Sequence, residues 1–292
     1  METTQLQKLA EKNAICCEGG GSTGIAHVGA LARLHELVGP LHIKNVIGSS
    51  VGSLIAAALA CGATPYYLHQ KMLEMDLTKF KDGGCFLVQF IRLLTKYGLH
   101  KGDYIETFIG DILFDLTGNR EITFKEAYER FNCLLTITYL STEQGQTIYA
   151  NHLNHPDHQI KTVACWSSSI PLFFKAPRNG TGLALDGGTL DNFPIGKLRE
   201  TSDPKNIIGL KLYNDKQINS TRIRNLKDYA FVVVNILREQ ALRYHVDDDD
   251  WKLTCRINVG KYRTTDFDLT YQDKEWLYNA GREGMDKFFK SL

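Results

Sequence analysis

The sequence lacks an excess of charge of either sign, and it has no apolar stretch long enough to span a membrane as a helix. Its 34 basic and 33 acidic side chains give a net charge of +1. A general electrostatic attraction to nucleic acid or to an anionic membrane is therefore excluded, and any contact with lipid must be local. We expect no nucleic-acid partner.

Features of exported proteins are also missing. The seven cysteines are odd in number, form no C-x-x-C pair and lie mostly inside apolar runs, as buried free thiols do. Residues 1–13 lack the apolar core of a secretory signal. These absences predict a soluble, cytoplasmic protein that contacts membranes only peripherally.

No repeat, low-complexity tract or linker rich in proline, glycine or serine divides the 292 residues. This length is sufficient for a full hydrophobic core. We therefore expect a single domain over residues 1–292, with the motifs described below inside residues 14–212. Residues 213–292 are expected to add helices and a strand that pack on this core.

Apolar periodicity and turn residues predict strands that alternate with helices. The predicted strands are residues 14–17, 44–47, 133–140, 147–150, 183–185, 207–212 and 252–259. The predicted helices are residues 25–38, 53–61, 222–243 and 272–289, with further helix starts at Thr64 and at two capping-box patterns, Asp103 with Glu106 and Thr123 with Glu126. This order predicts an α/β fold in which helices cover both faces of a largely parallel central sheet.

A glycine-rich loop at residues 19–24 (GGGSTG) follows the first predicted strand and precedes the first helix. Successive backbone amides in such a loop can point into one small space and bind negative charge. The loop also matches the G-x-G-x-x-G pattern of dinucleotide-binding proteins. That function requires an acidic residue about 20 positions further on, where this sequence has Gly48, Ser49 and Ser50. A tight turn without a ligand is a third interpretation, and three glycines in a row argue against it because their backbone entropy is costly.

Residues 48–52 (GSSVG) form a G-x-S-x-G pattern with Ser50 at its centre, between a predicted strand and a predicted helix. The two glycines allow a sharp turn, so that the serine hydroxyl projects from the top of the sheet. The following helix directs its positive dipole end toward the same place. Both the glycine loop and this turn lie within the first 52 residues, whereas an α/β-hydrolase usually places its nucleophile after several strands.

In this order the motifs resemble those of the patatin-like phospholipases. The shared segments are the glycine loop at 19–24 followed by Gly29-Ala30-Leu31, the turn at 48–52, residues 164–171 (ACWSSSIP), residues 186–188 (DGG) and residues 192–194 (NFP). The likeness covers residues 14 to about 212 and is weaker in the final helix. Thr23 occupies a place where this family often carries arginine or lysine.

The resemblance implies a three-layer α/β/α sandwich and a serine lipid acyl hydrolase that cleaves fatty-acyl esters of phospholipids or lysophospholipids through an acyl-enzyme. In this family an aspartate activates the serine, so Ser50 would be the nucleophile and Asp186 the base. The backbone amides of Gly19, Gly20 and Gly21 would bind the oxyanion. No cofactor and no metal are implied. Burial beside Ser50 would raise the proton affinity of Asp186 toward that of a useful base.

Other assignments stay open from the residues alone. A histidine triad would need a histidine after the acid, and His245 is the only one, next to the acidic run at 247–250. His152, His155 and His158 have a spacing that suggests a metal site, but Pro156 interrupts them, and a polar loop is the simpler interpretation. A catalytically silent protein that binds lipid or a partner is the remaining alternative.

Two apolar groups have both a structural and a functional interpretation. Residues 85–97 are more apolar than a surface helix requires, so they form either a core helix or a lid that contacts the bilayer and admits an acyl chain. Phe173, Phe174 and Phe193 follow the motif segments, and we predict that they line the substrate pocket, although core positions would suit them equally.

Overall fold

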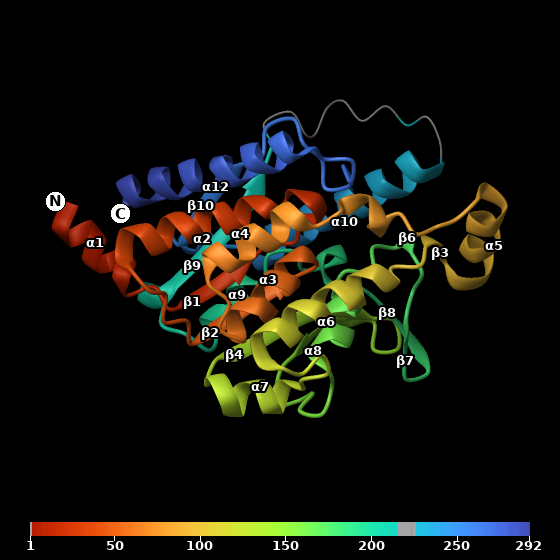
Figure 1. Cartoon of the computed structure of the whole chain (residues 1–292), viewed down its shortest axis with the longest axis horizontal. Helices are drawn as coiled ribbons and strands as arrows, with labels where there is room; N and C mark the ends of the chain where they lie inside the picture. Colours follow the sequence, from red (N-terminus) through yellow and green to blue (C-terminus); the bar gives the residue numbers. More distant parts are fainter. Residues whose placement is uncertain (1, 215–222, 224–225) are drawn as a thin grey trace.

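The structure is a computed structural model that describes residues 2–214, 223 and 226–292 (Figure 1). Its central sheet has eight strands in the order β10-β9-β1-β2-β4-β8-β7, with β5 paired to β4. The strands are β1 (Ala14–Cys17), β2 (Asn45–Ser49), β4 (Leu134–Ser141), β5 (Gln146–Ala150), β7 (Arg178–Asn179), β8 (Gly182–Asp186), β9 (Ile207–Tyr213) and β10 (Thr254–Asn258). All pairings from β10 to β4 are parallel, and the pairings that involve β5, β7 and β8 are antiparallel. The predicted, largely parallel sheet is confirmed.

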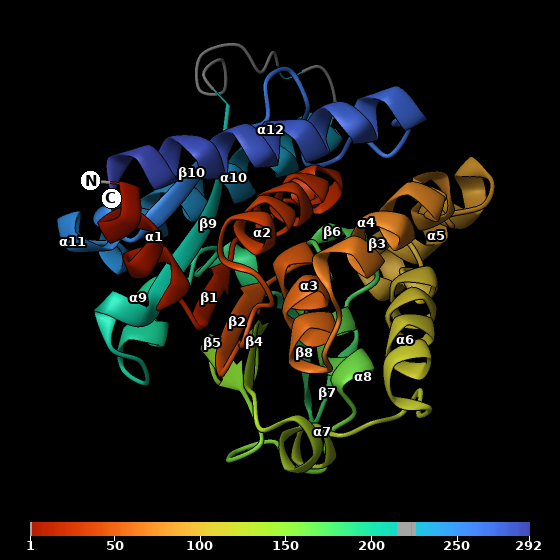
Figure 2. The ribbon, with the colours of Figure 1, turned by 60° about the vertical axis from the view of Figure 1, so that its left-hand side comes forward.

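Helices surround this sheet, and a small second sheet pairs β3 (Gly98–His100) with β6 (Leu172–Phe174). The helices are α1 (Glu2–Ala10), α2 (Ile25–Val38), α3 (Val51–Ala60), α4 (Pro65–Glu74), α5 (Phe86–Lys96), α6 (Asp103–Thr117), α7 (Phe124–Phe131), α8 (Ile160–Ser167), α9 (Ile195–Arg199), α10 (Leu226–His245), α11 (Asp248–Lys252) and α12 (Tyr271–Ser291). Figure 2 shows α2, α3 and α12 across one face of the sheet. The predicted helix at 222–243 corresponds to α10, and residues 222, 224 and 225 lie outside the described part of the chain.

Strand β1 shows why the sheet needs a layer on each face. Successive side chains of a strand point to opposite sides. Ile15 and Cys17 accordingly belong to the larger hydrophobic cluster, which includes α2 and α3. Ala14 and Cys16 belong to a second cluster with residues of α9. The three-layer α/β/α arrangement predicted from the sequence is confirmed.

One predicted helix start is wrong in detail. Asp103 does not cap α6, because Gly102 is the N-cap and Asp103 is already the first helical residue. The carboxylate of Asp82 instead accepts hydrogen bonds from the amides of Lys101, Gly102 and Asp103 at 2.6, 3.1 and 3.2 Å. A distant carboxylate thus satisfies the free amides at this helix end, and no local pattern announces it. The capping box of Thr123 with Glu126 is confirmed.

The strand predicted at 252–259 is shorter than expected because a helix precedes it. Asp247 and Asp250 form a capping box that starts α11 directly before β10. Strand β10 then pairs with β9 at the edge of the sheet. Helix α12 packs on α2 and β10, so the C-terminal part of the chain adds to both the sheet and its covering layer.

Helix α5 combines an apolar sequence with an exposed position. None of its residues is buried, and Phe86 is 82% exposed. The interpretation of residues 85–97 as a core helix is therefore wrong. No helix among the described residues has the length and apolarity needed to cross a bilayer.

Candidate active site

Ser50 occupies a sharp turn between β2 and α3. Its backbone angles are φ 52° and ψ −128°, a conformation that is strained for a residue with a side chain. Glycines on either side make the turn possible. A Cβ on Gly48 would overlap the carbonyl of Gly52, and a Cβ on Gly52 would overlap the carbonyl of Cys17. The G-x-S-x-G spacing is therefore a steric requirement of this turn.

Hydrogen bonds hold the Ser50 backbone in place. Its amide donates to Oγ of Ser167 on α8 at 2.9 Å. Its carbonyl accepts from Oγ of Ser53, one turn into α3, at 2.6 Å. Neither bond uses the Ser50 hydroxyl, which remains available for chemistry at the N-terminal end of α3.

Asp186 is the last residue of β8 and is 2% exposed. Its Oδ1 accepts from the Gly188 amide at 2.7 Å, while its buried Oδ2 has no hydrogen-bond partner among the described residues. Burial raises the pKa of this carboxyl, and the charge of Arg238, the hydroxyl of Ser50 and the amide of Gly188 oppose that rise.

The Ser50 hydroxyl is thus a direct polar neighbour of the Asp186 carboxylate. Their contact influences the pKa of Asp186 but is looser than a fully formed hydrogen bond. Looser geometry of this kind is common for an acid–base pair in the absence of substrate. The two side chains come from β2 and β8, which both border β4 in the sheet.

The glycine loop packs against the Ser50 turn. A Cβ on Gly19 would lie 3.0 Å from Cβ of Ser50, so the loop and the serine are in close contact. The amides of Gly20 and Gly21 donate to no acceptor within the described chain. These two donors are free to bind negative charge beside the serine.

The prediction that the Gly19 amide binds the oxyanion together with those of Gly20 and Gly21 needs correction. That amide already donates to the carbonyl of Asn192 at 3.0 Å. Thr23, where the resemblance leads us to expect arginine or lysine, donates from Oγ1 to the Gly20 carbonyl at 2.7 Å, inside the loop. The cation that acts on Asp186 in this chain is Arg238 of α10.

An apolar cavity opens beside Ser50. Its walls include Leu54, Met72, Leu77, Phe80, Phe108 and Phe174. The first of these residues belongs to α3, and the others come from elements between α4 and β6. The cavity also touches Gly21 and Ser50 itself. An apolar chain in this cavity would therefore have its end at the serine hydroxyl.

The three predicted pocket phenylalanines have different positions. Phe174 lines the apolar cavity. Phe173 lies behind it, with its ring 4.8 Å from the ring of Phe174 and 5.6 Å from that of Phe267. Phe193 is 0% exposed and lies in the second hydrophobic cluster, with Ala14 and Ile47. The prediction that Phe193 lines the substrate pocket is therefore wrong, because this side chain lies in the core.

Comparison with known proteins identifies the family of this chain. The family model described as patatin-like phospholipase matches residues 15–199. The chain belongs to this family.

Relatives of this patatin-like chain include uncharacterized protein YqhO of Bacillus subtilis, which is 27% identical over 93% of this chain and 96% of its own length. Triacylglycerol lipase 4 of Saccharomyces cerevisiae is 27% identical over 71% of this chain, a match that spans 25% of the lipase. The crystal structure of VipD from Legionella pneumophila superposes with a TM-score of 0.69 at 16% identity, over 96% of this chain and 67% of VipD. The superposition supports the patatin-like fold.

Sequence reasoning missed the residues that brace the glycine loop of this patatin-like site. Glu18 is buried, and its Oε1 accepts from Lys211 Nζ at 2.6 Å and from Asn192 Nδ2 at 3.0 Å. Its Oε2 accepts from the Leu212 amide at 2.7 Å. Asn192 also donates to the Gly19 carbonyl at 2.9 Å. The signals available in the sequence were an acid directly before the glycines and the asparagine of the N-x-P motif.

The histidines weighed as catalytic or metal-binding residues have partners other than Ser50 and Asp186 in this patatin-like chain. Burial raises the pKa of Asp191, and two groups oppose that rise: the Tyr149 hydroxyl, which donates a hydrogen bond to this carboxylate, and the charge of His245. The ring of His152 stacks on Tyr128 at 3.7 Å, and His155 contacts the Tyr139 hydroxyl at 3.1 Å. Within the described residues, no group of three or more histidine, cysteine or acidic side chains could hold a metal ion.

Proposed function

We propose that this chain is a serine lipid acyl hydrolase that cleaves fatty-acyl esters of phospholipids or lysophospholipids with a dyad of Ser50 and Asp186. Membership of the family supports lipid ester hydrolysis. The finer assignment depends chiefly on one observation, the buried and unpartnered Oδ2 of Asp186 beside the hydroxyl of Ser50. A carboxylate with a free oxygen and a raised pKa is suited to accept the proton of that hydroxyl.

The first half of the proposed reaction forms an acyl-enzyme. Ser50 Oγ attacks the ester carbonyl while its proton passes to Asp186. The carbonyl oxygen becomes an anion and accepts hydrogen bonds from the amides of Gly20 and Gly21. Collapse of this intermediate breaks the bond to the alcohol, which leaves with the proton from Asp186.

The second half releases the fatty acid. A water gives its proton to Asp186 and attacks the acyl-serine, and the same two amides bind the oxyanion again. The intermediate then breaks its bond to Ser50 Oγ, which takes the proton back from Asp186. The acyl chain occupies the apolar cavity throughout, since that cavity begins at Ser50. No metal takes part in the proposed steps.

Replacement of the serine tests the proposal. We expect Ser50→Ala to lower kcat/KM by about 10⁴-fold or more, and a fluorophosphonate probe to label the wild type but not this variant. Hydrolysis should continue in excess chelator. Ser49→Ala is a matched control, because it removes a neighbouring buried hydroxyl that has no hydrogen-bond partner in the described chain. Full hydrolysis by Ser50→Ala would reject the dyad. An unlabelled wild type that binds lipid without hydrolysing it would favour a silent binding protein.

Contact with a membrane surface is part of the proposal. Helix α5 exposes Phe86, Leu87, Ile91 and Leu94 to solvent by at least half of their surface. It contacts β3, and His100 of β3 pairs with Phe174 of β6, which lines the apolar cavity. An interfacial helix at this place would lead an acyl chain from the bilayer to Ser50. We place the enzyme in the cytoplasm, because all seven of its cysteines are free thiols.

A further inference from the structure

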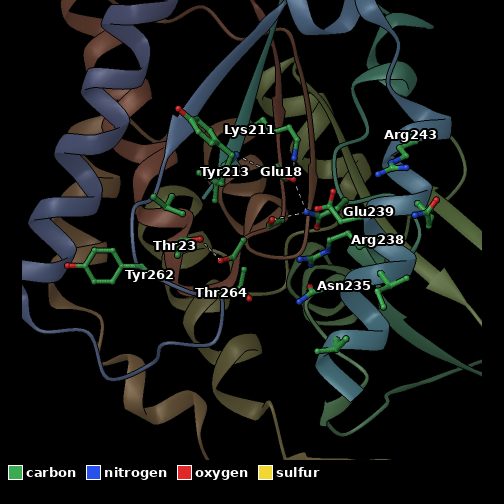
Figure 3. Close-up of a pocket in the computed structure, with 18 residues that line it drawn as sticks. Glu18, Thr23, Lys211, Tyr213, Asn235, Arg238, Glu239, Arg243, Tyr262 and Thr264 are labelled. Atoms are coloured by element: carbon green, nitrogen blue, oxygen red, sulfur yellow. Dashed lines mark hydrogen bonds and ion pairs between the residues drawn. The ribbon is translucent and has the colours of Figure 1, made fainter. Parts of the chain in front are cut away.

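A polar pocket of about 380 Å³ lies on the opposite side of the glycine loop from the apolar cavity. Gly19 and Gly20 line the polar pocket, whereas Gly21 and Ser50 line the apolar cavity. The two spaces therefore meet at the loop that carries the free amides. Figure 3 shows Glu18 and Lys211 on one side of the polar pocket and residues of α10 on the other.

The charges of this pocket do not cancel. Lys211 forms an ion pair with the buried Glu18, with Nζ 2.6 Å from Oε1, and the two charges neutralise each other. Among the described residues, Arg238 donates a hydrogen bond from Nε alone, to the Gly188 carbonyl at 3.1 Å. Arg243 has no ion-pair partner among the described residues, and the same holds for the remaining carboxylate, Glu239. Burial raises the pKa of Asp186 and the charge of Arg238 opposes that rise, but Asp186 does not line the pocket. Outside the pair of Lys211 with Glu18, the lining itself thus carries two arginines and one carboxylate, an excess of positive charge.

Helix geometry directs these groups into one space. Residues three or four positions apart lie on the same face of a helix. Asn235, Glu239 and Arg243 follow each other at intervals of four, and Arg238 lies three positions after Asn235. All four line the pocket, and Figure 3 shows Asn235 and Arg238 together on α10. Arginine presents several N–H donors in a planar fork that fits the oxygen atoms of a phosphate.

We propose that this pocket, defined by Arg238, Arg243 and Asn235 opposite the glycine loop, binds the phosphate of a glycerophospholipid headgroup. This inference rests on the proposed function. An ester placed at Ser50 has its acyl chain in the apolar cavity, and its alcohol part extends past the loop. A phosphate there would meet the two arginines. A triacylglycerol would instead place a second apolar chain among charged groups, which costs their hydration. The pocket therefore selects phospholipids over neutral glycerides.

The test compares two substrates with the same acyl chain, palmitoyl lysophosphatidylglycerol and monopalmitoylglycerol. We expect Arg243→Gln to lower kcat/KM for the phospholipid about tenfold or more, which corresponds to ~1.4 kcal/mol, and to leave the neutral ester within twofold. Glu239→Gln should raise kcat/KM for the phospholipid, because it removes a repulsive charge. Arg178→Gln is the matched control, since this exposed arginine of β7 does not line the pocket. Equal loss on both substrates, or no loss on either, would overturn the inference.

A binding measurement separates this inference from the proposed catalysis. Ser50→Ala protein is titrated with glycerol 3-phosphate in a calorimeter. Saturable binding that Arg243→Gln weakens, and that Arg178→Gln leaves unchanged, supports the pocket even if no ester is hydrolysed by the wild type. Absence of saturable binding to Ser50→Ala protein would reject the phosphate site, whether or not the wild type is an esterase.

Discussion

Helices α3 and α5 are both short and apolar, but they have opposite environments. Nine residues of α3 are buried, whereas α5 has none. Helix α3 packs on β1, β2 and β4 and on three further helices, α6, α7 and α8, while α5 packs mainly on the short strand β3. Apolar side chains alone therefore do not decide whether a helix belongs to the core, because this depends on what the rest of the chain places over it.

The difference suits two functions. Helix α3 must hold Ser50 in a strained conformation, and strain persists only where the surroundings fix it on every side. Helix α5 must present apolar side chains to a surface outside the protein if it contacts lipid. The following predictions test this contrast.

The largest expected effect comes from the same truncation made in each helix. Ile55 of α3 is 0% exposed, and Ile91 of α5 is 51% exposed. We expect Ile55→Ala to lower the free energy of unfolding by about 2–5 kcal/mol, because it leaves a cavity in the packed core. Ile91→Ala should change it by less than about 0.5 kcal/mol. Urea denaturation, monitored by circular dichroism, measures the free energy of unfolding of both variants. Similar losses in the two variants would show that α5 packs against the protein in solution.

A second, smaller effect concerns the membrane. The double variant Phe86→Ser/Phe90→Ser should hydrolyse phospholipid in vesicles at least about tenfold more slowly than the wild type. Each aromatic side chain contributes roughly 1.5–3 kcal/mol when it is buried, and a tenfold change corresponds to ~1.4 kcal/mol. Hydrolysis of a soluble short-chain ester should not change. Leu153→Ser is the control, because Leu153 is 76% exposed on a different loop. An equal loss on both substrates would mean that α5 supports the active site and not the bilayer contact.

The smallest expected effect is on the melting temperature of the protein when Asp186, beside Ser50, is replaced. Burial raises the pKa of Asp186 in the folded protein. A carboxyl of this kind contributes most to stability below its unfolded pKa of about 3.9, and this contribution is lost as the pH rises through the folded pKa. Asp186→Asn should therefore be inactive but melt at a higher temperature than the wild type at pH 7, with a smaller difference at pH 5. Differential scanning calorimetry at both pH values measures this.

The activity of the wild type gives the matching pH profile. If Asp186 is the base, as proposed, it must be ionised, so kcat/KM should rise with pH through the raised pKa of Asp186 and then level off. In the calorimetry experiment on Asp186→Asn, a melting temperature well below that of the wild type at pH 7 would contradict the first expectation. It would indicate that the carboxylate stabilises the fold through its charge.

Much of the active site could be predicted from the sequence because its constraints are local. Gly48 and Gly52 are required within one turn, and the glycine loop is one continuous segment next to a strand. The role of the Gly19 amide could not be predicted, since its acceptor is the carbonyl of Asn192, far along the chain. The same holds for Asp82, which caps α6 from outside the helix. The place of Phe193 depended on which face of the sheet its segment covers.

By itself, the sequence determined the alternation of strands and helices, the turn at Ser50 and the order of the motifs, because backbone sterics and periodicity act over a few residues. Tertiary structure alone decided which groups meet. It placed Asp186 beside Ser50, brought Arg238 and Arg243 of α10 to the glycine loop, and left α5 exposed. Contacts between distant segments depend on the packing of the whole chain, so no local pattern specifies them.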